Sequence, residues 1–212
     1  NLKGLNIDFE IGLIVNKKNT FIRLIVFLGM AISKILTYIY RLIVARYLGP
    51  EDYGTLNLSL TILFVLLSIA IIAHPSAIVR YVSFYKGKND PSKIKGTIIA
   101  GLKLDFISSF IIGLILFFGA NYISLNIFHT DKLIPLLKLF AFLIPITTFG
   151  SIFQASIEGF QKVKYTTIIR NFSESSIQTI STLILLLLGV GILGAAIGYF
   201  LAIASSAILL FI

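Results

Sequence analysis

Long apolar runs follow one another along almost the whole chain, and they leave very few folds open to it. A helix that crosses a bilayer needs about 20 mostly apolar residues, and hydrophobic residues make up 57% of the 212 positions against 13% charged. A single water-soluble core could not bury so many such runs. The sequence therefore predicts an all-α integral membrane protein with six transmembrane helices. The expected spans are Thr20–Tyr47, Gly54–Val79, Thr97–Tyr122, Leu133–Ile157, Thr166–Leu188 and Ile192–Ile212.

Residues 1–19 precede the first span and are too polar to cross a bilayer. They predict a cytoplasmic N-terminal segment that lies along the membrane surface, without the apolar core and cleavage site of a signal peptide. Because the first residue is not methionine and Ile212 ends the chain inside an apolar run, we expect the chain to be part of a longer protein. The charged residues of the segment are Lys3, Asp8, Glu10, Lys17 and Lys18.

The stretch Leu48-Gly49-Pro50-Glu51-Asp52-Tyr53-Gly54 separates the first two spans and predicts a tight helical hairpin. Gly49 can adopt the left-handed conformation that closes a helix, and Pro50 suits the first turn of the next helix. Glu51 and Asp52 place negative charge at the positive N-terminal end of that helix. We expect this stretch to be structural.

The distribution of cations predicts the orientation of the chain, because Lys and Arg in short loops stay on the cytoplasmic side. With the N-terminus inside, the outer segments hold only Arg46 and Lys132. We therefore expect a multi-pass protein of the plasma (inner) membrane with a cytoplasmic N-terminus. The cations of the inner segments are Lys3, Lys17, Lys18, Arg23, Arg80, Lys86, Lys88, Lys93, Lys95, Lys162, Lys164 and Arg170.

Several function classes are excluded by composition. The basic residues behind the net charge of +9 are scattered over the inner loops, so no nucleic-acid-binding patch is expected. Cysteine is absent, and the two histidines, His74 and His129, are far apart in sequence. We expect no metal site, no cofactor and no catalytic residue.

The remaining four cations fall inside predicted spans, where each costs about 2.5–3.5 kcal/mol to insert and requires a partner or water. Two of these four, Lys34 and Arg41, share a narrow sector of the first span with Arg23. Of these three cations, only Arg23 lies close enough to the inner surface to extend into it. One face of this helix is therefore expected to be wet or paired. The four cations are Lys34, Arg41, Lys103 and Lys138, and the sector holds Arg23, Met30, Lys34, Tyr38 and Arg41.

Three other spans carry polar residues at helical spacing along one face. Such stripes suggest a shared aqueous lumen, while the alternative is that the polar groups join helices by hydrogen bonds. The stripes are Asn57, Thr61 and Ser68 in the second span, Thr147, Ser151, Gln154 and Glu158 in the fourth, and Arg170, Glu174, Gln178 and Ser181 in the fifth.

Two acidic residues also lie at membrane depth. Glu174 follows Arg170 by four residues and can pair with it along the helix. Asp105 and Lys103 point to nearly opposite faces and cannot pair with each other. An ion-coupling role is open for Asp105, but a structural salt bridge to Arg170 or to a residue near Lys103 is favoured.

Proline and glycine positions add expectations about shape. Pro145 interrupts the fourth span and Pro75 lies near the end of the second, where each permits a bend. Gly194 and Gly198 predict a small-residue packing face on the last helix. The longest loop, Arg80–Gly96, is expected to be a solvated turn.

Three motifs carry a resemblance to a known family. They are Arg46-Tyr47-Leu48-Gly49-Pro50-Glu51-Asp52-Tyr53-Gly54, then Pro75-Ser76-Ala77-Ile78-Val79-Arg80-Tyr81, and Glu158-Gly159-Phe160-Gln161-Lys162-Val163-Lys164-Tyr165. In this order and at helix junctions, they resemble the polysaccharide flippases of the Wzx type, within the multidrug/oligosaccharidyl-lipid/polysaccharide exporter superfamily. The resemblance runs from about residue 20 to the end.

The resemblance implies a MATE-like transporter of two similar lobes, with residues 20–212 forming the N-terminal lobe of six helices and the C-terminal lobe missing from this chain. It also implies a polyprenyl diphosphate-linked oligosaccharide as substrate, moved from the inner to the outer leaflet by alternating access.

On this hypothesis the cations of a lumen neutralise the diphosphate while the prenyl tail stays among the membrane lipids. Lys34 and Arg41 are the main candidates, and Lys103, Lys138 and Arg170 are lesser ones. The candidates for hydrogen bonds to sugar hydroxyls are Asn57, Gln154, Glu174 and Gln178.

Three rival functions remain open from the sequence. A multidrug or cation antiporter of the same superfamily would favour a carboxylate-rich lumen, and a peptidoglycan-precursor flippase would share the cationic one. A membrane glycosyltransferase would need acidic groups on a sizeable outer loop, where only Glu51, Asp52 and Asp131 are found.

Overall fold

The computed structural model describes residues 2–162 and 166–211, and side chains within 31–211 except at positions 33, 36, 163–165, 168, 171 and 172. The predicted cytoplasmic segment 1–19, together with Arg23 and Met30, lies outside the described side chains. In the described residues the fold is entirely helical, as expected. Its elements are α1 (Leu2–Ala70), α2 (Pro75–Gly87), α3 (Pro91–Tyr122), η1 (Ile123–Ile127), α4 (Leu133–Gly159), η2 (Ile168–Ser173), α6 (Glu174–Leu187) and α7 (Ile192–Phe211).

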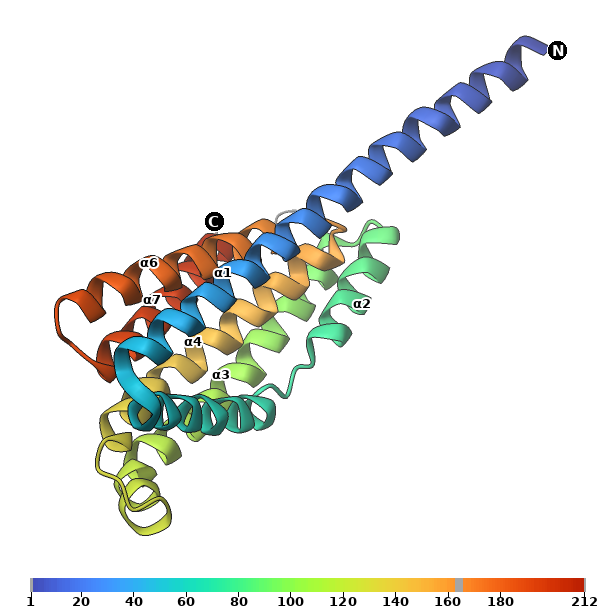
Figure 1. Cartoon of the computed structure of the whole chain (residues 1–212). Helices are drawn as coiled ribbons and strands as arrows, with labels where there is room; N and C mark the ends of the chain where they lie inside the picture. Colours follow the sequence, from blue (N-terminus) through green and yellow to red (C-terminus); the bar gives the residue numbers. More distant parts are fainter. Residues whose placement is uncertain (1, 163–165, 212) are drawn as a thin grey trace.

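Helix α1 consists of two legs that meet at Gly49, where the chain doubles back (Figure 1). Gly49 has φ 77° and ψ 173°, a conformation that side chains disfavour. The predicted hairpin is confirmed, although ψ is extended rather than that of a left-handed helix. Pro50 opens the second leg, as its fixed φ and missing N–H allow.

The hairpin tip is held by an ionic contact that the sequence did not reveal. The Lys132 ammonium, just before α4, lies 2.7 Å from Asp52 Oδ1 and 3.0 Å from Glu51 Oε1. Hydrogen bonds to Asp52 and then Glu51 raise the pKa of Lys132 to about 12. Glu51 and Asp52 therefore join the tip to the start of α4, in addition to their place at a helix N-terminus.

The second span differs most from its prediction. Instead of one helix over Gly54–Val79, the second leg of α1 ends at Ala70, residues 71–74 are non-helical, and α2 begins at Pro75. Pro75 thus marks a full break rather than a bend. The expected loop Arg80–Gly96 is much shorter than predicted, because α2 continues to Gly87 and α3 begins at Pro91, which leaves a largely exposed turn at residues 88–90.

Asp90 explains why α3 starts so early. Its carboxylate accepts a hydrogen bond from the Lys93 amide at 3.1 Å and forms an ion pair with the Lys93 ammonium at 3.3 Å. This N-cap, with Pro91 directly after it, begins the helix six residues before the predicted Thr97. Hydrogen bonding, chiefly from the Lys93 amide, lowers the pKa of Asp90.

Helix α4 is the central helix and packs against α1, α2, α3 and α7. Its residues Leu133, Leu136, Leu137 and Phe140 are fully buried in the main core. Although Pro145 lies inside α4, the helix runs unbroken from Leu133 to Gly159, close to the expected span.

Helix α7 packs closely on α6 through glycine, as predicted. A Cβ added to Gly198 would lie 2.9 Å from the Thr182 backbone nitrogen, and one on Gly194 would lie 3.0 Å from Leu185 Cβ. The fifth span is less regular than expected, because its first turns form the π-helical η2 before α6 begins.

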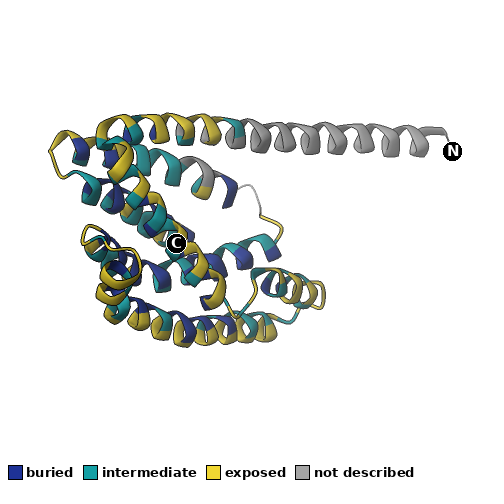
Figure 2. Ribbon diagram, turned by 60° about the horizontal axis from the view of Figure 1, so that its bottom comes forward, coloured by how far each residue is buried: buried dark blue, intermediate teal, exposed yellow. Residues whose placement is uncertain are grey.

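The outer surface of the helices is apolar, which suits contact with lipid. Phe118, Phe211 and Leu188 are 75%, 72% and 71% exposed, and exposed residues line the outward faces of the helices while buried ones point inward (Figure 2). Four described segments are long and apolar enough to cross a membrane: Thr37–Ala70, Pro91–Ile127, Leu133–Gly159 and Ile192–Phe211. The first of these contains the Gly49 turn.

Candidate functional site

The first leg of α1 presents a cationic face within the first span predicted from the sequence. Lys34, Tyr38 and Arg41 follow one another at helical spacing and are all exposed, Tyr38 by 64%. The other side of the helix places Tyr40 and Val44 in the main core. Packing of that side fixes which way the cations point, and we call Lys34, Tyr38 and Arg41 the α1 face.

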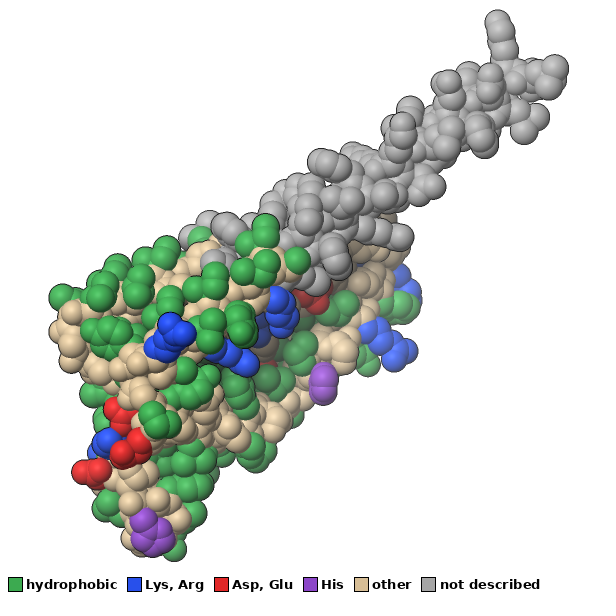
Figure 3. All heavy atoms as spheres, viewed as in Figure 1, with side chains coloured by type: hydrophobic (Ala, Val, Ile, Leu, Met, Phe, Trp, Pro, Cys, Tyr) green, Lys and Arg blue, Asp and Glu red, His purple; other side chains and the backbone are tan. Residues whose placement is uncertain are grey.

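Neither cation of the α1 face forms an ion pair with another residue whose side chain is described. Figure 3 shows Lys and Arg side chains grouped in the middle of the surface that α1 crosses, with hydrophobic side chains around them. Charge exposed in this way would be costly against lipid. The face therefore suits contact with water, an anion or another protein surface.

The polar stripe on the second leg of α1 is exposed, and its hydrogen bonds close within the helix. Asn57 Nδ2 donates to Tyr53 O at 2.7 Å, Thr61 Oγ1 to Asn57 O at 2.8 Å and Ser68 Oγ to Val65 O at 2.6 Å. These bonds do not join neighbouring helices, which was the alternative for this stripe. Asn57 and Thr61 still have acceptor oxygens available for a ligand.

A second polar group joins α4 to η2. The Arg170 guanidinium donates to Gln154 Oε1, and Gln154 Nε2 donates to Glu158 Oε1 at 2.7 Å. Arg170 thus bonds to α4, and the ion pair with Glu174 that their spacing allows is not among the ion pairs of the described residues. Both nevertheless line one small hollow between α4, η2, α6 and α7, with Ser151 beside them.

Gln178 lies one turn further along α6, in a different setting. Its side chain is half-buried beside the hydroxyl of Tyr40. Gln178 therefore links α6 to the buried side of α1, whereas Lys34 and Arg41 lie on the exposed side of the same helix.

Asp105 is buried at the break between α1 and α2. Its Oδ1 accepts a hydrogen bond from the Ala73 amide at 2.8 Å. The Ile72 amide, which also donates to Ala70 O at 3.1 Å, faces the same carboxylate. One turn along α3, Ser108 Oγ donates to Ala70 O at 2.5 Å.

These contacts replace part of the backbone hydrogen bonding that the broken helix loses. Asp105 Oδ2 is buried and has no hydrogen-bond partner among the described atoms. The expected salt bridge is wrong, because the partners of Asp105 are backbone amides rather than Arg170 or a residue near Lys103.

The other two candidate cations lie apart from the α1 face. Lys103 is exposed on α3, on the side away from buried Asp105, as predicted. The Lys138 ammonium of α4 lies 5.8 Å from the centre of the Phe117 ring of α3. The structure therefore gathers Gln154, Glu158, Arg170 and Glu174 at one place, and leaves Lys34 and Arg41, Gln178, Asp105, Lys103 and Lys138 at others.

Sequence reasoning missed the helix break and its support. The signal that could have revealed it was the pair Asp105 and Ser108, which lie about one turn apart on a mostly apolar span. In the part of the chain that the structure describes, no three His, Asp or Glu residues gather where they could hold a metal ion.

Comparisons with known proteins agree with this architecture. A family model described as "Polysaccharide biosynthesis protein" matches residues 18–212. No curated protein matches the sequence.

Among solved structures, the chain is similar to "Crystal structure of MATE in the bent conformation", with TM-score 0.72 and 17% identity over 88% of this chain and 41% of that one. It is also similar to "Outward-facing conformation of a multidrug resistance MATE family transporter of the MOP superfamily", with TM-score 0.67 and 18% identity over 87% of this chain and 42% of that one. The chain thus spans about two fifths of the length of either, and the likeness establishes a MATE-like transporter fold.

Proposed function

Because the chain belongs to the polysaccharide biosynthesis protein family of membrane transporters, we propose that it is part of a flippase for lipid-linked oligosaccharide. The substrate is a polyprenyl diphosphate that carries sugars, moved from the inner to the outer leaflet for assembly of surface polysaccharide. The observation that carries the proposal is the α1 face, with two exposed cations, Lys34 and Arg41, in a membrane-spanning helix.

The chemistry of the substrate explains why such a face is useful. A diphosphate cannot enter hydrocarbon unpaired, because each desolvated charge costs several kcal/mol. Arg41 can hold two phosphate oxygens with its planar guanidinium, and Lys34 supplies a second, more mobile point charge. These contacts replace water around the diphosphate during transfer, while the prenyl tail stays in lipid. No covalent step is required of the chain.

The polar group around Arg170 is proposed as the sugar-binding part. Glycan hydroxyls need both donors and acceptors. Arg170 and Glu174 provide them in one small hollow, and Gln154 is bonded to Arg170. Gln178 and Asn57 are further candidates. Lys103 and Lys138 remain lesser candidates for phosphate, since they lie away from the α1 face.

We propose that a second lobe completes the transporter. The chain matches about two fifths of each MATE structure, so a C-terminal lobe would face the cationic surface and rock against this one in alternating access. We further propose an inner-membrane location with a cytoplasmic N-terminus, an orientation that the cation distribution favours. Ion coupling through Asp105 is a secondary proposal, supported by the unpartnered Oδ2.

The test is made with the full-length gene in its own host. The gene is deleted and restored as wild type, as the double variant Lys34→Ala/Arg41→Ala, or as Arg46→Ala. Arg46 is the matched control, because it is an exposed cation on the same helix but lies about 120° around it from Lys34. Lipid-linked oligosaccharide on the inner leaflet is then quantified.

We expect accumulation in the deletion strain and in the double variant, and normal levels with Arg46→Ala. Normal lipid-linked oligosaccharide in the deletion strain would refute the flippase proposal. Accumulation of peptidoglycan precursor instead would identify the other lipid substrate.

A multidrug antiporter is the second candidate function, because the similar solved structures are MATE proteins and one of them is a multidrug resistance transporter. In that case the deletion makes cells sensitive to cationic dyes without changing lipid-linked sugars. A lumen lined by Lys34 and Arg41 would repel a cationic drug, which favours the anionic substrate.

A further inference from the structure

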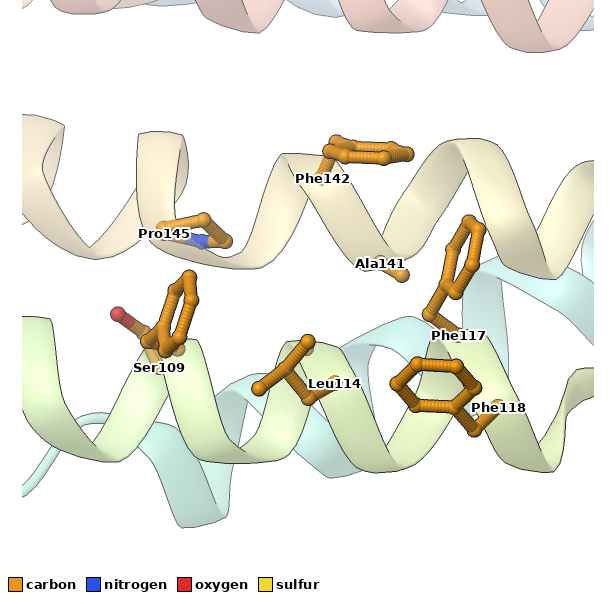
Figure 4. A pocket seen from close by; sticks show the side chains of 9 residues that line it. Ser109, Leu114, Phe117, Phe118, Ala141, Phe142 and Pro145 are labelled. Atoms are coloured by element: carbon orange, nitrogen blue, oxygen red, sulfur yellow. The ribbon is translucent and has the colours of Figure 1, made fainter.

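An aromatic groove runs between α3 and α4, apart from the α1 face and from the polar group around Arg170. Its hollow has a volume of about 220 Å³, and its lining includes Phe117 and Phe118 of α3 and Phe142 of α4 (Figure 4). Phe118 and Phe142 are 75% and 59% exposed. Ser109 is its only hydroxyl-bearing wall residue, so the groove suits a hydrocarbon chain.

Two residues shape the floor of the groove: Gly113, which has no side chain, and Pro145, which has no backbone N–H. A Cβ at Gly113 would lie 2.9 Å from Ala141 O, so only glycine permits α3 to approach α4 here. Pro145 has no N–H to donate to that same carbonyl. The hollow is therefore a product of the fold and is kept open by Gly113.

One end of the groove carries a positive charge. Lys138 precedes Ala141, Phe142 and Pro145 on the same stripe of α4, one turn closer to the start of the helix. Its ammonium lies 5.8 Å from the centre of the Phe117 ring, which itself packs edge-on against Phe142 with ring centres 5.6 Å apart. The groove therefore ends at a cation held over its aromatic wall.

The groove lies on the other side of α4 from the α1 face. The α4 residues that share the main core with Tyr40 and Val44 of α1 include Leu137 and Phe140, whereas Phe142 is exposed. An occupant of the groove therefore meets the surrounding bilayer rather than the proposed path of the substrate.

The length of the groove matches the hydrocarbon thickness of one leaflet. From Ser109 to Phe118 the groove follows α3 for about 13.5 Å, at about 1.5 Å per residue, and half of the bilayer's hydrocarbon core is about 15 Å thick. Lys138 lies five residues after the first residue of α4, where its side chain reaches the polar boundary. This is the side that the cation distribution predicts to be outer.

We propose that the groove binds an acyl chain of an anionic phospholipid of that leaflet, with its phosphodiester against the Lys138 ammonium. One cation matches the single charge of a phosphodiester, and a diphosphate would require more. Tyr122, exposed one turn beyond Phe118, offers a hydroxyl at the same rim.

The experiment uses the purified full-length protein in mild detergent and native mass spectrometry, with phosphatidylglycerol and phosphatidylcholine of the same chains. The wild-type protein is expected to bind phosphatidylglycerol about fivefold more tightly, the factor typical of one lysine near an anionic headgroup. Lys138→Gln is expected to remove this preference and leave phosphatidylcholine binding unchanged.

Two further variants make the test specific. Lys88→Gln is the matched control. The Lys88 ammonium also lies over a phenylalanine ring, 4.5 Å from the Phe84 centre, but Lys88 is at the end of α2 and does not line the groove. Lys88→Gln should keep the preference. Leu114→Trp fills the groove from a side chain that is 41% exposed, and should weaken both lipids even if Lys138→Gln does not fold.

Equal binding of the two lipids by the wild-type protein, or no effect of Leu114→Trp, would overturn the proposal. So would Lys138-dependent binding of a polyprenyl monophosphate more tightly than phosphatidylglycerol, because the groove would then hold the substrate's own tail.

Discussion

Replacing Asp105 tests whether its carboxylate holds the broken helix in place. Asp105→Asn keeps an oxygen that can accept the Ala73 amide, now 2.8 Å from Oδ1, whereas Asp105→Ala leaves that amide without its acceptor. Both variants are neutral at this position, so the loss of the carboxylate charge is common to both and does not affect the difference between them. The difference in stability therefore reports the hydrogen bond and the cavity alone.

The expected magnitude follows from the burial of the site. A buried amide left without its partner costs about 1–3 kcal/mol. For a unit of about 200 residues, each kcal/mol corresponds to about 2–4 °C in Tm, so Asp105→Ala should unfold about 2–12 °C below Asp105→Asn. Because a buried charge is itself costly, Asp105→Asn should be at least as stable as the wild-type protein.

The assay is thermal unfolding of the purified full-length protein in detergent, combined with hydrogen exchange of residues 71–74. Exchange should accelerate in Asp105→Ala and not in Asp105→Asn. Ser109→Ala is the control, because the Ser109 hydroxyl bonds only within its own helix, to Phe106 O at 3.2 Å. Equal Tm values for the two Asp105 variants, with unchanged exchange at residues 71–74, would refute the role assigned to this carboxylate.

Three further perturbations test the packing and the loop contacts. Gly198→Ala should cost about 1–3 kcal/mol by overpacking against the Thr182 backbone, measured as a lower Tm, while Gly119→Ala, whose nearest neighbour is Ile123 Cδ1 at 3.8 Å, should not. Lys132→Met should speed hydrogen exchange at residues 128–132, and added salt should do so partly in the wild-type protein. Because the folded-state pKa of Lys132 is raised to about 12, its contribution is complete below the unfolded value of 10.5 and is lost as the pH rises through 12. Asp90→Ala should fray the first turn of α3, seen as faster exchange at residues 91–94. In the wild-type protein this cap, whose pKa is lowered, contributes fully above pH 3.8 and is lost as the pH falls through the lowered value. Unchanged hydrogen exchange in Lys132→Met or in Asp90→Ala would contradict the contact assigned to that residue.

Parts of the candidate site could be predicted because they depend on a single helix. Lys34, Tyr38 and Arg41 share a face by helical periodicity alone, and the structure exposes all three. The opposite placement of Lys103 and Asp105 follows from the same rule. Whether these cations bind phosphate stays a prediction.

Contacts between helices could not be predicted in the same way. The spacing of Arg170 and Glu174 allowed a pair along their own helix, but Arg170 donates to Gln154 of α4. The π-helical geometry of η2 changes which residues lie on one face. Lys138 was grouped with the other cations by depth, and only the tertiary structure brings its ammonium to 5.8 Å from the centre of the Phe117 ring.

The sequence by itself determined the membrane-spanning class, the run of helices and the Gly49 hairpin, because apolar length and local backbone preferences act over a few residues. Tertiary structure decided the break at residues 71–74, since its amides and carbonyl are held by Asp105 and Ser108, more than thirty residues further along the chain. It also decided the ionic contact between Lys132 and the hairpin tip. In each case the partner is distant in sequence, and no local pattern specifies the pairing.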